Sequence, residues 1–292
     1  MSRASVTRMG HAAVRVRDLD RSARFAEEVL GMRESDRIDG VSYLTCNERH
    51  HELMLVEAEE LALDHIAFEV ADGDALAEVG GRIEAAGWRL LDEPLEAGIE
   101  DAVRCVGPAG FVFELFVGMR LEPEAPFPQA RIRPRAIEHA TLTVSDLEQM
   151  KGFFIDMLGF DGSDEVPGAI AWLRCSGRHH DFNLMAGPDS FHHQAWEVPG
   201  LSEIGAVADL IGERGQTMVW GPGRHSPGHV LFGYFADAEG VINEFCADVE
   251  PVPSDYQPVI WPDVAATGNR WGAVSPEGFV DMGIPVSRSG RA

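Results

Sequence analysis

The chain has 292 residues, of which 45% are hydrophobic and 25% are charged, the composition of a globular protein long enough for two hydrophobic cores. Its formal net charge of −24 argues against nucleic acid and anionic membrane surfaces as partners, because both bind a basic protein face.

The predicted elements recur in one order along the chain. The first stretch opens with alternating apolar residues over 12–16, which indicate a half-buried strand, and an amphipathic helix over 20–29 follows that Gly31 ends. Short strands come next, near 41–45 and 52–56. The same order then occurs three more times, with strands or helices predicted at 65–70, 75–86, 89, 103 and 112, at 140–144, 147–157, 169–174 and 182–185, and at 193–198, 204–213, 218, 231 and 242.

A series of histidine, histidine and glutamate appears twice in these elements. The two series are His11, His65 and Glu114, then His139, His193 and Glu244. By difference of residue numbers, the two histidines are 54 residues apart in both series, and the glutamate follows 49 and 51 residues later. The flanking sequences also match, as in GHAAVRVRDL and EHATLTVSDL. Repetition at this period indicates two copies of one module.

The repeat predicts an α+β fold of two tandem modules, each made of paired βαβββ units that form a curved mixed sheet around a cleft. We place the N-terminal module at 1–122 and the C-terminal module at 135–250. Residues 123–134 contain four prolines and suit a semi-rigid linker. A second proline-rich segment, 251–292, is expected to wrap the C-terminal module as a tail.

Two imidazoles and one carboxylate are a recognised metal-ligand set. Held on one face of a metal, they leave three coordination positions open, which suits ferrous iron that binds a substrate and dioxygen together. Zinc, nickel, cobalt or manganese could use the same ligands. A single buried histidine is more often a hydrogen-bonded core residue. Six matched positions favour metal binding instead.

The second module carries further residues that can transfer protons. They are His180, His225 and Tyr234, of which the last two precede Glu244 by 19 and 10 residues. At the same offsets before Glu114 the first module has Leu95 and Arg104, neither of which transfers protons at neutral pH. We therefore assign the chemistry to the C-terminal module.

His225, Tyr234 and Glu244 form an H-x(8)-Y-x(9)-E arrangement. With this motif the chain resembles, along nearly all its length, the type I extradiol ring-cleaving dioxygenases of the vicinal oxygen chelate superfamily, the catechol 2,3-dioxygenase-like enzymes. Two positions depart from that family's usual pattern. Gly233 stands where a large apolar residue is usual, and Ala238 stands where a proline is usual.

The resemblance implies an enzyme that cleaves the aromatic ring of a catechol-type diol with O2 to a semialdehyde acid, in aromatic hydrocarbon catabolism. It implies that Fe(II), with Mn(II) as the alternative, is the cofactor. Carried over residue by residue, the metal ligands are His139, His193 and Glu244, the acid–base residue on the dioxygen side is His180, and the pair that engages the substrate hydroxyls is His225 and Tyr234.

The first module also departs from the family, because it keeps ligand-type residues that the usual member has lost from its N-terminal module. Here His11, His65 and Glu114 persist. We interpret them as inherited residues that are buried without metal, and a second metal site is the alternative.

Two other functions use the same fold. A glyoxalase-like isomerase or lyase has a similar metal cage but no need for His180, His225 and Tyr234, and a non-catalytic binding protein usually lacks complete ligands. No apolar run approaches the roughly 18 residues of a membrane span, and no signal-type segment opens the chain, so we expect a soluble cytoplasmic protein. Large apolar residues in the proline-rich tail suggest that it docks onto a module or onto a neighbouring subunit, so we expect a homo-oligomer.

Overall fold

The protein is described by a computed structural model that covers residues 5–123, 125–127 and 129–287. Residues 124 and 128, in the predicted linker, and the two chain ends lie outside the described residues. Within the described part, no helix is long and apolar enough to cross a membrane.

The first half of the chain contains two βαβββ units in succession. The first unit comprises β1 (Val6–Val16), α1 (Leu19–Glu28), β2 (Arg33–Ile38), β3 (Val41–Thr45) and β4 (Leu53–Glu57). The second comprises β5 (Ala62–Val70), α2 (Gly73–Ala85), β6 (Arg89–Leu91), β7 (Ile99–Val106) and β8 (Val112–Met119).

The second half repeats both units. The third unit comprises β9 (Ala136–Val144), α3 (Leu147–Phe153) with its π-helical continuation η2 (Phe154–Leu158), β10 (Asp161–Val166), β11 (Ile170–Arg174) and β12 (Phe182–Ala186). The fourth comprises β13 (Ser190–Glu197), α4 (Leu201–Glu213), β14 (Trp220–Arg224), β15 (Leu231–Ala236) and β16 (Ile242–Ala247). Gly159 follows η2 with a φ of 81°, which is the left-handed cap expected from the sequence.

Each module forms one mixed sheet. The first has the order β2-β3-β4-β1-β5-β8-β7-β6, and the second has β14-β15-β16-β13-β9-β12-β11-β10-β17. The opening strands of the two units in a module, β1 with β5 and β9 with β13, pair antiparallel at the centre of the sheet. Each opening strand also pairs in parallel with the last strand of a unit, as β5 does with β8 and β13 does with β16. The predicted α+β fold of two tandem modules is confirmed.

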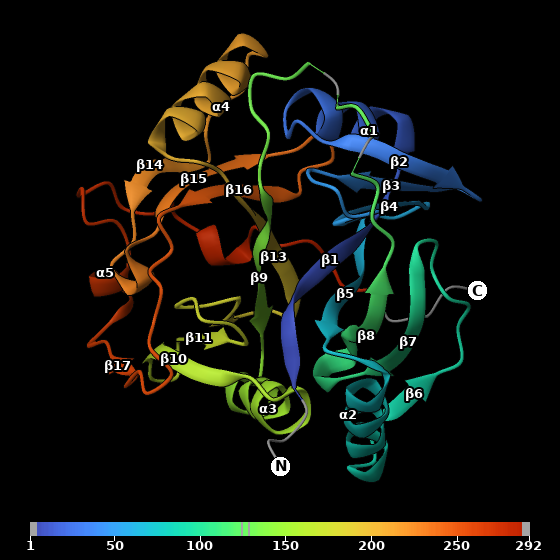
Figure 1. The fold of residues 1–292 in the computed structure, drawn as a ribbon. Helices are drawn as coiled ribbons and strands as arrows, with labels where there is room; N and C mark the ends of the chain where they lie inside the picture. Colours follow the sequence, from blue (N-terminus) through green and yellow to red (C-terminus); the bar gives the residue numbers. More distant parts are fainter. Residues whose placement is uncertain (1–4, 124, 128, 288–292) are drawn as a thin grey trace.

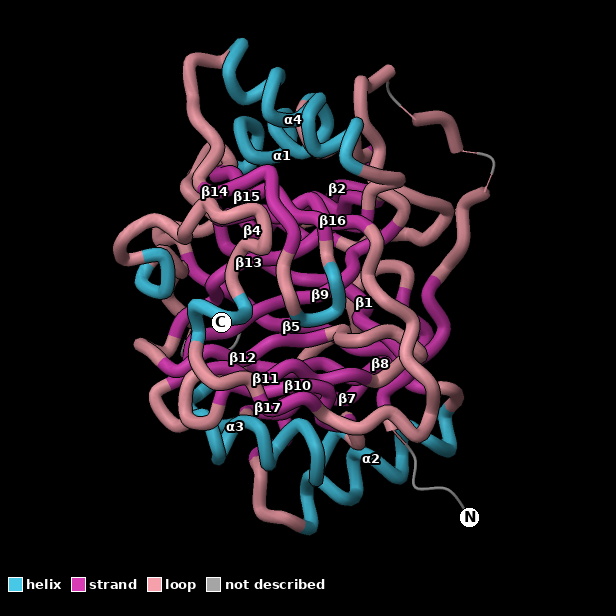
Figure 2. The backbone as a smooth tube through the Cα atoms, turned by 90° about the vertical axis from the view of Figure 1, so that its left-hand side faces the viewer, coloured by secondary structure: helices cyan, strands magenta, loops and turns pink. Residues whose placement is uncertain are grey.

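The two modules pack against each other through their helices and a shared aromatic core. Figures 1 and 2 show α1 beside α4 at one end of the molecule and α2 beside α3 at the other. The Phe68 ring lies 5.8 Å from that of Phe154, and the Trp88 and Phe113 rings lie 5.1 and 5.4 Å from that of Phe153. Contacts of this kind bury large apolar areas, so the modules form one body.

The segment after β16 runs across the second module and reaches the first. It contains β17 (Val259–Ile260), which pairs with β10, the short helix α5 (Val264–Thr267) and the turn η4 (Phe279–Asp281). Ile284 then exchanges backbone hydrogen bonds with Phe191, and Leu63 of β5 does so with Pro285 and Ser287. The tail therefore touches both modules, while the boundaries of the modules themselves stay a prediction.

Candidate metal centre

The three predicted ligands of the second module come from three adjacent central strands. His139 lies on β9, His193 on β13 and Glu244 on β16. His139 and Glu244 both stand opposite Ala195 of β13, one from each side, and His193 lies two residues before Ala195. Because side chains alternate along a strand, these three point to the same face of the sheet.

The donor atoms of these residues converge. The two Nε2 atoms are 3.3 Å apart, and Glu244 Oε2 lies 3.2 Å from His139 Nε2 and 3.3 Å from His193 Nε2. Both carboxylate oxygens of Glu244 are buried without a hydrogen-bond partner. A buried carboxylate with open lone pairs between two imidazole nitrogens is the donor set that divalent transition metals use, so the residues fit such an ion.

Neighbouring side chains orient the ligands. The Glu138 carboxylate accepts a hydrogen bond from His139 Nδ1, which directs the opposite ring nitrogen, Nε2, at Glu244. Burial alone would lower the pKa of His139, but the charges of Glu138 and Glu244 raise it to about 10. Burial also opposes ionisation of Glu244, yet the imidazoles of His139 and His193 hold its pKa below the usual range. The two carboxylates thus favour positive charge at His139, and a metal ion bound to Nε2 would supply that charge in place of a proton.

All six predicted site residues line one cavity of about 410 Å³. They are His139, His180, His193, His225, Tyr234 and Glu244. The structure therefore brings the proposed ligands and the proposed proton-transfer residues together, although the roles themselves stay a prediction.

His225 and Tyr234 form a hydrogen-bonded pair on one side of the cavity. The Tyr234 hydroxyl lies 3.1 Å from His225 Nε2, and His225 Nδ1 lies 2.9 Å from the Gly268 carbonyl. Because a carbonyl only accepts, Nδ1 carries the proton and Nε2 is the acceptor for the Tyr234 hydroxyl. Burial, and next the charge of Glu244, raise the pKa of Tyr234 well above its usual value, so the hydroxyl stays protonated.

His180 lies on the other side, beside His139, with 5.0 Å between the ring centroids. Its Nδ1 is 2.9 Å from His179 Nδ1, and His179 Nε2 is 3.2 Å from Asp164 Oδ2, so two buried residues hold the ring. This arrangement leaves His180 Nε2 for the cavity. Burial, followed by the nearby His139, lowers the pKa of His180 well below its usual value, so the ring is neutral at neutral pH.

The family model described as "Glyoxalase/Bleomycin resistance protein/Dioxygenase superfamily" matches residues 8–115 and 136–245, which is well over half of the chain. The chain belongs to this superfamily. The two matched segments coincide with the two sheets, so both modules are superfamily modules.

Several relatives within the superfamily match nearly the whole chain. Metapyrocatechase 2 from Cupriavidus necator is 27% identical, with 95% of this chain and 92% of that protein covered. The manganese-dependent 2,3-dihydroxybiphenyl 1,2-dioxygenase from Geobacillus genomosp. 3 is 24% identical, with 88% and 90% covered.

Solved structures give the same picture of the fold. The Mn(II)-bound glyoxalase from Novosphingobium aromaticivorans has a TM-score of 0.86 and 26% identity, and covers 93% of this chain and 92% of its own. Homoprotocatechuate 2,3-dioxygenase from Brevibacterium fuscum, in complex with 3,4-dihydroxyphenylacetate, has a TM-score of 0.88 and 22% identity, and covers 97% and 94%.

The sequence did not predict that the tail forms part of the wall of the cavity in the second module. Residues Thr267, Gly268, Asn269 and Phe279 line it, and the Phe279 ring lies 5.1 Å from that of Tyr234. His192, which is adjacent to a ligand, donates a hydrogen bond from Nε2 to the Phe279 carbonyl at 2.7 Å. No motif marks these positions, because their contacts depend on a fold-back of irregular backbone.

Gly233 departs from the usual pattern for a packing reason. A Cβ at this position would lie 2.7 Å from Ile204 Cγ2 and 3.0 Å from Met218 Cε, so α4 and the chain that follows it occupy the space that a side chain would need. In this chain, side chains from α4 and the segment after it fill the space that the large apolar residue usual in similar enzymes would occupy.

Matched glycine variants test this explanation. We expect Gly233→Ala to destabilise the protein by about 1–3 kcal/mol through overpacking. Gly205, on α4 itself, has open space around it, since a Cβ added there would meet no atom within 4 Å. Gly205→Ala is therefore expected to stabilise the protein by about 0.5–1 kcal/mol. Thermal unfolding measures both, and shifts of the same sign would contradict the packing explanation.

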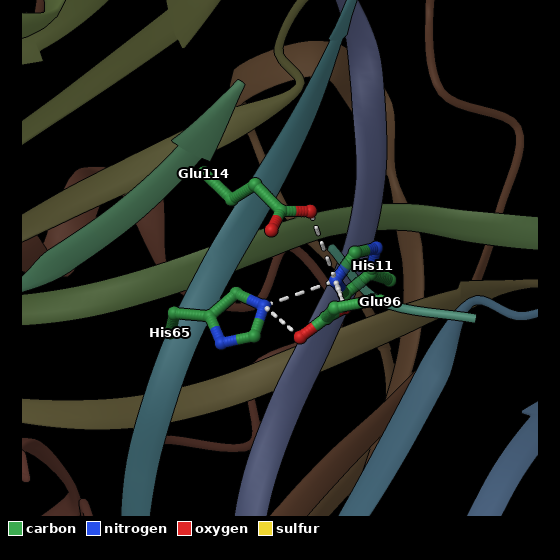
Figure 3. Close-up of side chains that lie close together, drawn as sticks. All are labelled: His11, His65, Glu96 and Glu114. Atoms are coloured by element: carbon green, nitrogen blue, oxygen red, sulfur yellow. Dashed lines mark hydrogen bonds and ion pairs between the residues drawn. The ribbon is translucent and has the colours of Figure 1, made fainter. Parts of the chain in front are cut away.

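The first module holds a counterpart of the metal centre. His11 and Glu114 stand opposite Ala67 of β5, and His65 lies two residues before it, which is the register seen in the second module. Figure 3 shows a fourth side chain, Glu96, that points into the same cluster. Sequence reasoning placed Leu95 at this offset, but Leu95 is 52% exposed and its neighbour Glu96 enters the site instead.

Proposed function

We propose that the chain is an extradiol dioxygenase that cleaves the ring of a catechol-type diol with O2, using Fe(II) or Mn(II) held by His139, His193 and Glu244. The observation that carries this proposal is the shared cavity, in which the ligand set faces both His180 and the hydrogen-bonded pair of His225 and Tyr234. The names of the relatives support it, since they are catechol-cleaving and biphenyl-diol-cleaving dioxygenases.

The pair of His225 and Tyr234 serves the diol. Nε2 of His225 is a proton acceptor, because the Gly268 carbonyl holds the ring proton on Nδ1. When the diol enters between His225 and Tyr234, the Tyr234 hydroxyl leaves Nε2, which takes a proton from one substrate hydroxyl, and the Tyr234 hydroxyl donates a hydrogen bond to the resulting oxygen. The bound metal ion supplies the charge that favours this ionisation and the path for electrons between the diol and dioxygen.

His180 serves the dioxygen side. Its ring is fixed at Nδ1 by His179, and its Nε2 is left to deliver a proton to oxygen as the ring opens. Burial, followed by the nearby His139, lowers the pKa of His180, so its ring is neutral before the reaction and can accept a proton and pass it on. A group of this kind contributes a rate factor of about 10²–10⁴.

The wall of the cavity favours a diol with an apolar substituent. Ile170, Trp172, Met185, Val274 and Phe279 contribute side chains to it. Among the described residues that line the cavity, none is a lysine or arginine that could pair with a substrate carboxylate. Burying an unpaired carboxylate against such a wall is costly, so alkyl- or aryl-substituted catechols fit better than catechols that carry an acid group.

The test is a substrate panel with protein reconstituted anaerobically with Fe(II), and separately with Mn(II). On mixing with air-saturated buffer, we expect a yellow ring-fission product and one O2 consumed per diol. The kcat/KM for 3-methylcatechol or 2,3-dihydroxybiphenyl should exceed that for a carboxylate-bearing catechol by at least about tenfold. A preference for the acidic diol would contradict the assignment of the wall.

A glyoxalase-like isomerase is the second candidate, because the Mn(II)-bound glyoxalase shares this fold at 26% identity. That chemistry uses a carboxylate base and consumes no O2. An absence of colour and of oxygen uptake across a broad diol panel, with metal bound, would favour it.

A further inference from the structure

A second set of metal-type donors lies buried in the first module, away from the cavity of the second. We propose that His11, His65, Glu96 and Glu114 bind a divalent transition-metal ion with a structural role. The proposal does not rest on the dioxygenase activity, since none of these four residues lines the catalytic cavity.

The spacing of the donor atoms fits one central ion. His11 Nε2 lies 3.0 Å from His65 Nε2 and 3.1 Å from Glu96 Oε2, and His65 Nε2 lies 3.5 Å from Glu96 Oε1. Glu114 Oε1 lies 3.8 Å from His11 Nε2 (Figure 3). Four donors at about 2.0–2.2 Å from an ion in tetrahedral arrangement stand roughly 3.3–3.6 Å apart, so the cluster needs little adjustment to close around a metal.

Two donor atoms of the cluster, on His65 and Glu114, carry lone pairs that point into it. His65 Nδ1 lies 2.8 Å from the Asp64 carboxylate, which fixes the ring proton on Nδ1 and leaves a bare Nε2 facing His11. A carboxylate that holds a histidine in this way is the usual partner of a metal ligand. Glu114 Oε1 is buried and has no hydrogen-bond partner, although it points at the cluster (Figure 3).

The charges around the cluster also favour a bound cation, because carboxylates outnumber the arginine side chain that pairs with them. Arg104 bonds with Glu114 at 2.7 Å, with Glu93 at 2.5 Å and with Glu96, so one guanidinium faces three carboxylates. Glu96 and Glu114 are at most 1% exposed at their side chains. Buried charge of one sign is unfavourable unless it is compensated, and a divalent cation supplies the two positive charges that are missing.

The coordination in the first module is closed, unlike that in the second. Arg104 stands opposite Glu114 in the register that Tyr234 has opposite Glu244. The first module therefore has an arginine at the position where the second module has the tyrosine proposed to engage the substrate. Four protein ligands without an open position are typical of structural metal sites. The ion would join β1, β5 and β8 to the segment between β6 and β7 that carries Glu96. The contribution of Glu96 is what turns the inherited triad, expected from sequence to be metal-free, into a complete site.

Metal counting on the purified, full-length protein tests the proposal. We expect about two divalent transition-metal ions per chain by mass spectrometry. We expect about one after the folded protein is treated with a chelator, because the second site lines a cavity whereas the donors of the first are at most 1% exposed. His193→Ala should retain about one ion without chelation, and Glu114→Gln should lose one ion and lower Tm. Glu93→Gln is the matched control, since Glu93 contacts Arg104 but is not in the donor set.

Metal counts can also overturn the proposal. One ion per chain in the wild type, with none in His193→Ala after growth or refolding with Mn(II), Fe(II) or Zn(II), would overturn the second site. If Glu114→Gln fails to fold, the count in His193→Ala still decides, because that variant leaves the first module intact. Loss of ring cleavage in any variant leaves these counts unaffected, so the two proposals fail separately.

Discussion

His193→Ala is expected to remove the metal from the second module and to abolish ring cleavage. The side chain supplies one of only three protein donors, and its Nε2 lies 3.3 Å from both of the others. Loss of a residue that merely supports a ligand typically weakens metal affinity by about 10–100-fold, so removal of a ligand itself should exceed this. The readouts are metal content, after dialysis against a low metal concentration, and oxygen uptake with a catechol.

His229→Ala is the matched control for this variant. His229 is a histidine of the same region, but its side chain is 51% exposed and pairs with Glu250 at 3.1 Å outside the cavity. The control should keep its metal and its turnover. Undiminished metal content together with full activity in His193→Ala would remove the residue from the ligand set.

His180→Ala is expected to keep the metal and to lose at least about 10² in kcat, the contribution typical of a positioned acid–base group. Its ring is not among the donors that converge on Glu244, so its removal leaves the ligand set complete. Metal content and the rate of the single turnover, measured with excess protein, separate binding from chemistry. The His229→Ala control applies here as well.

The pH dependence sharpens this test. Since the pKa of His180 lies well below its usual value, the neutral ring is present throughout the neutral range and its lone pair is lost only in acid. The wild type should therefore lose activity as pH falls through that low pKa. The variant should keep only the acid limb that comes from protonation of His225, whose pKa burial also lowers. Undiminished turnover in a metal-replete His180→Ala protein would sink the proposed role.

The sequence predicted the fold, and it predicted that the two histidines and the glutamate of each series lie together, because both depend on local patterns that occur twice. Alternation places His139, His193 and Glu244 on strand faces, and the equal spacing of the two series reflects the same pairing register in both sheets. Helix positions were also close, since Asp18, Asp72 and Asp146 cap three of them. The starts of α2 and α4 lie two or three residues earlier than predicted.

The sequence could not supply residues that reach a site through irregular backbone. Glu96 lies in a segment without strand or helix, and only the fold directs it, rather than Leu95, toward His11. Gly268 and Phe279 likewise arrive from the tail, where no periodicity relates them to the repeat. A homo-oligomer and the exact module boundaries stay predictions.

The proposed ligands and part of the cavity wall come from different parts of this chain. The duplicated sheets carry the ligands, whereas a segment with no counterpart in the repeat supplies Phe279 to the cavity wall and Gly268 to His225, and then bonds to Leu63 beside the first module's histidines. Mutation in that segment can alter which diols enter without touching a single ligand. A substitution at Phe279 is therefore expected to change the shape of the cavity while every proposed ligand stays in place.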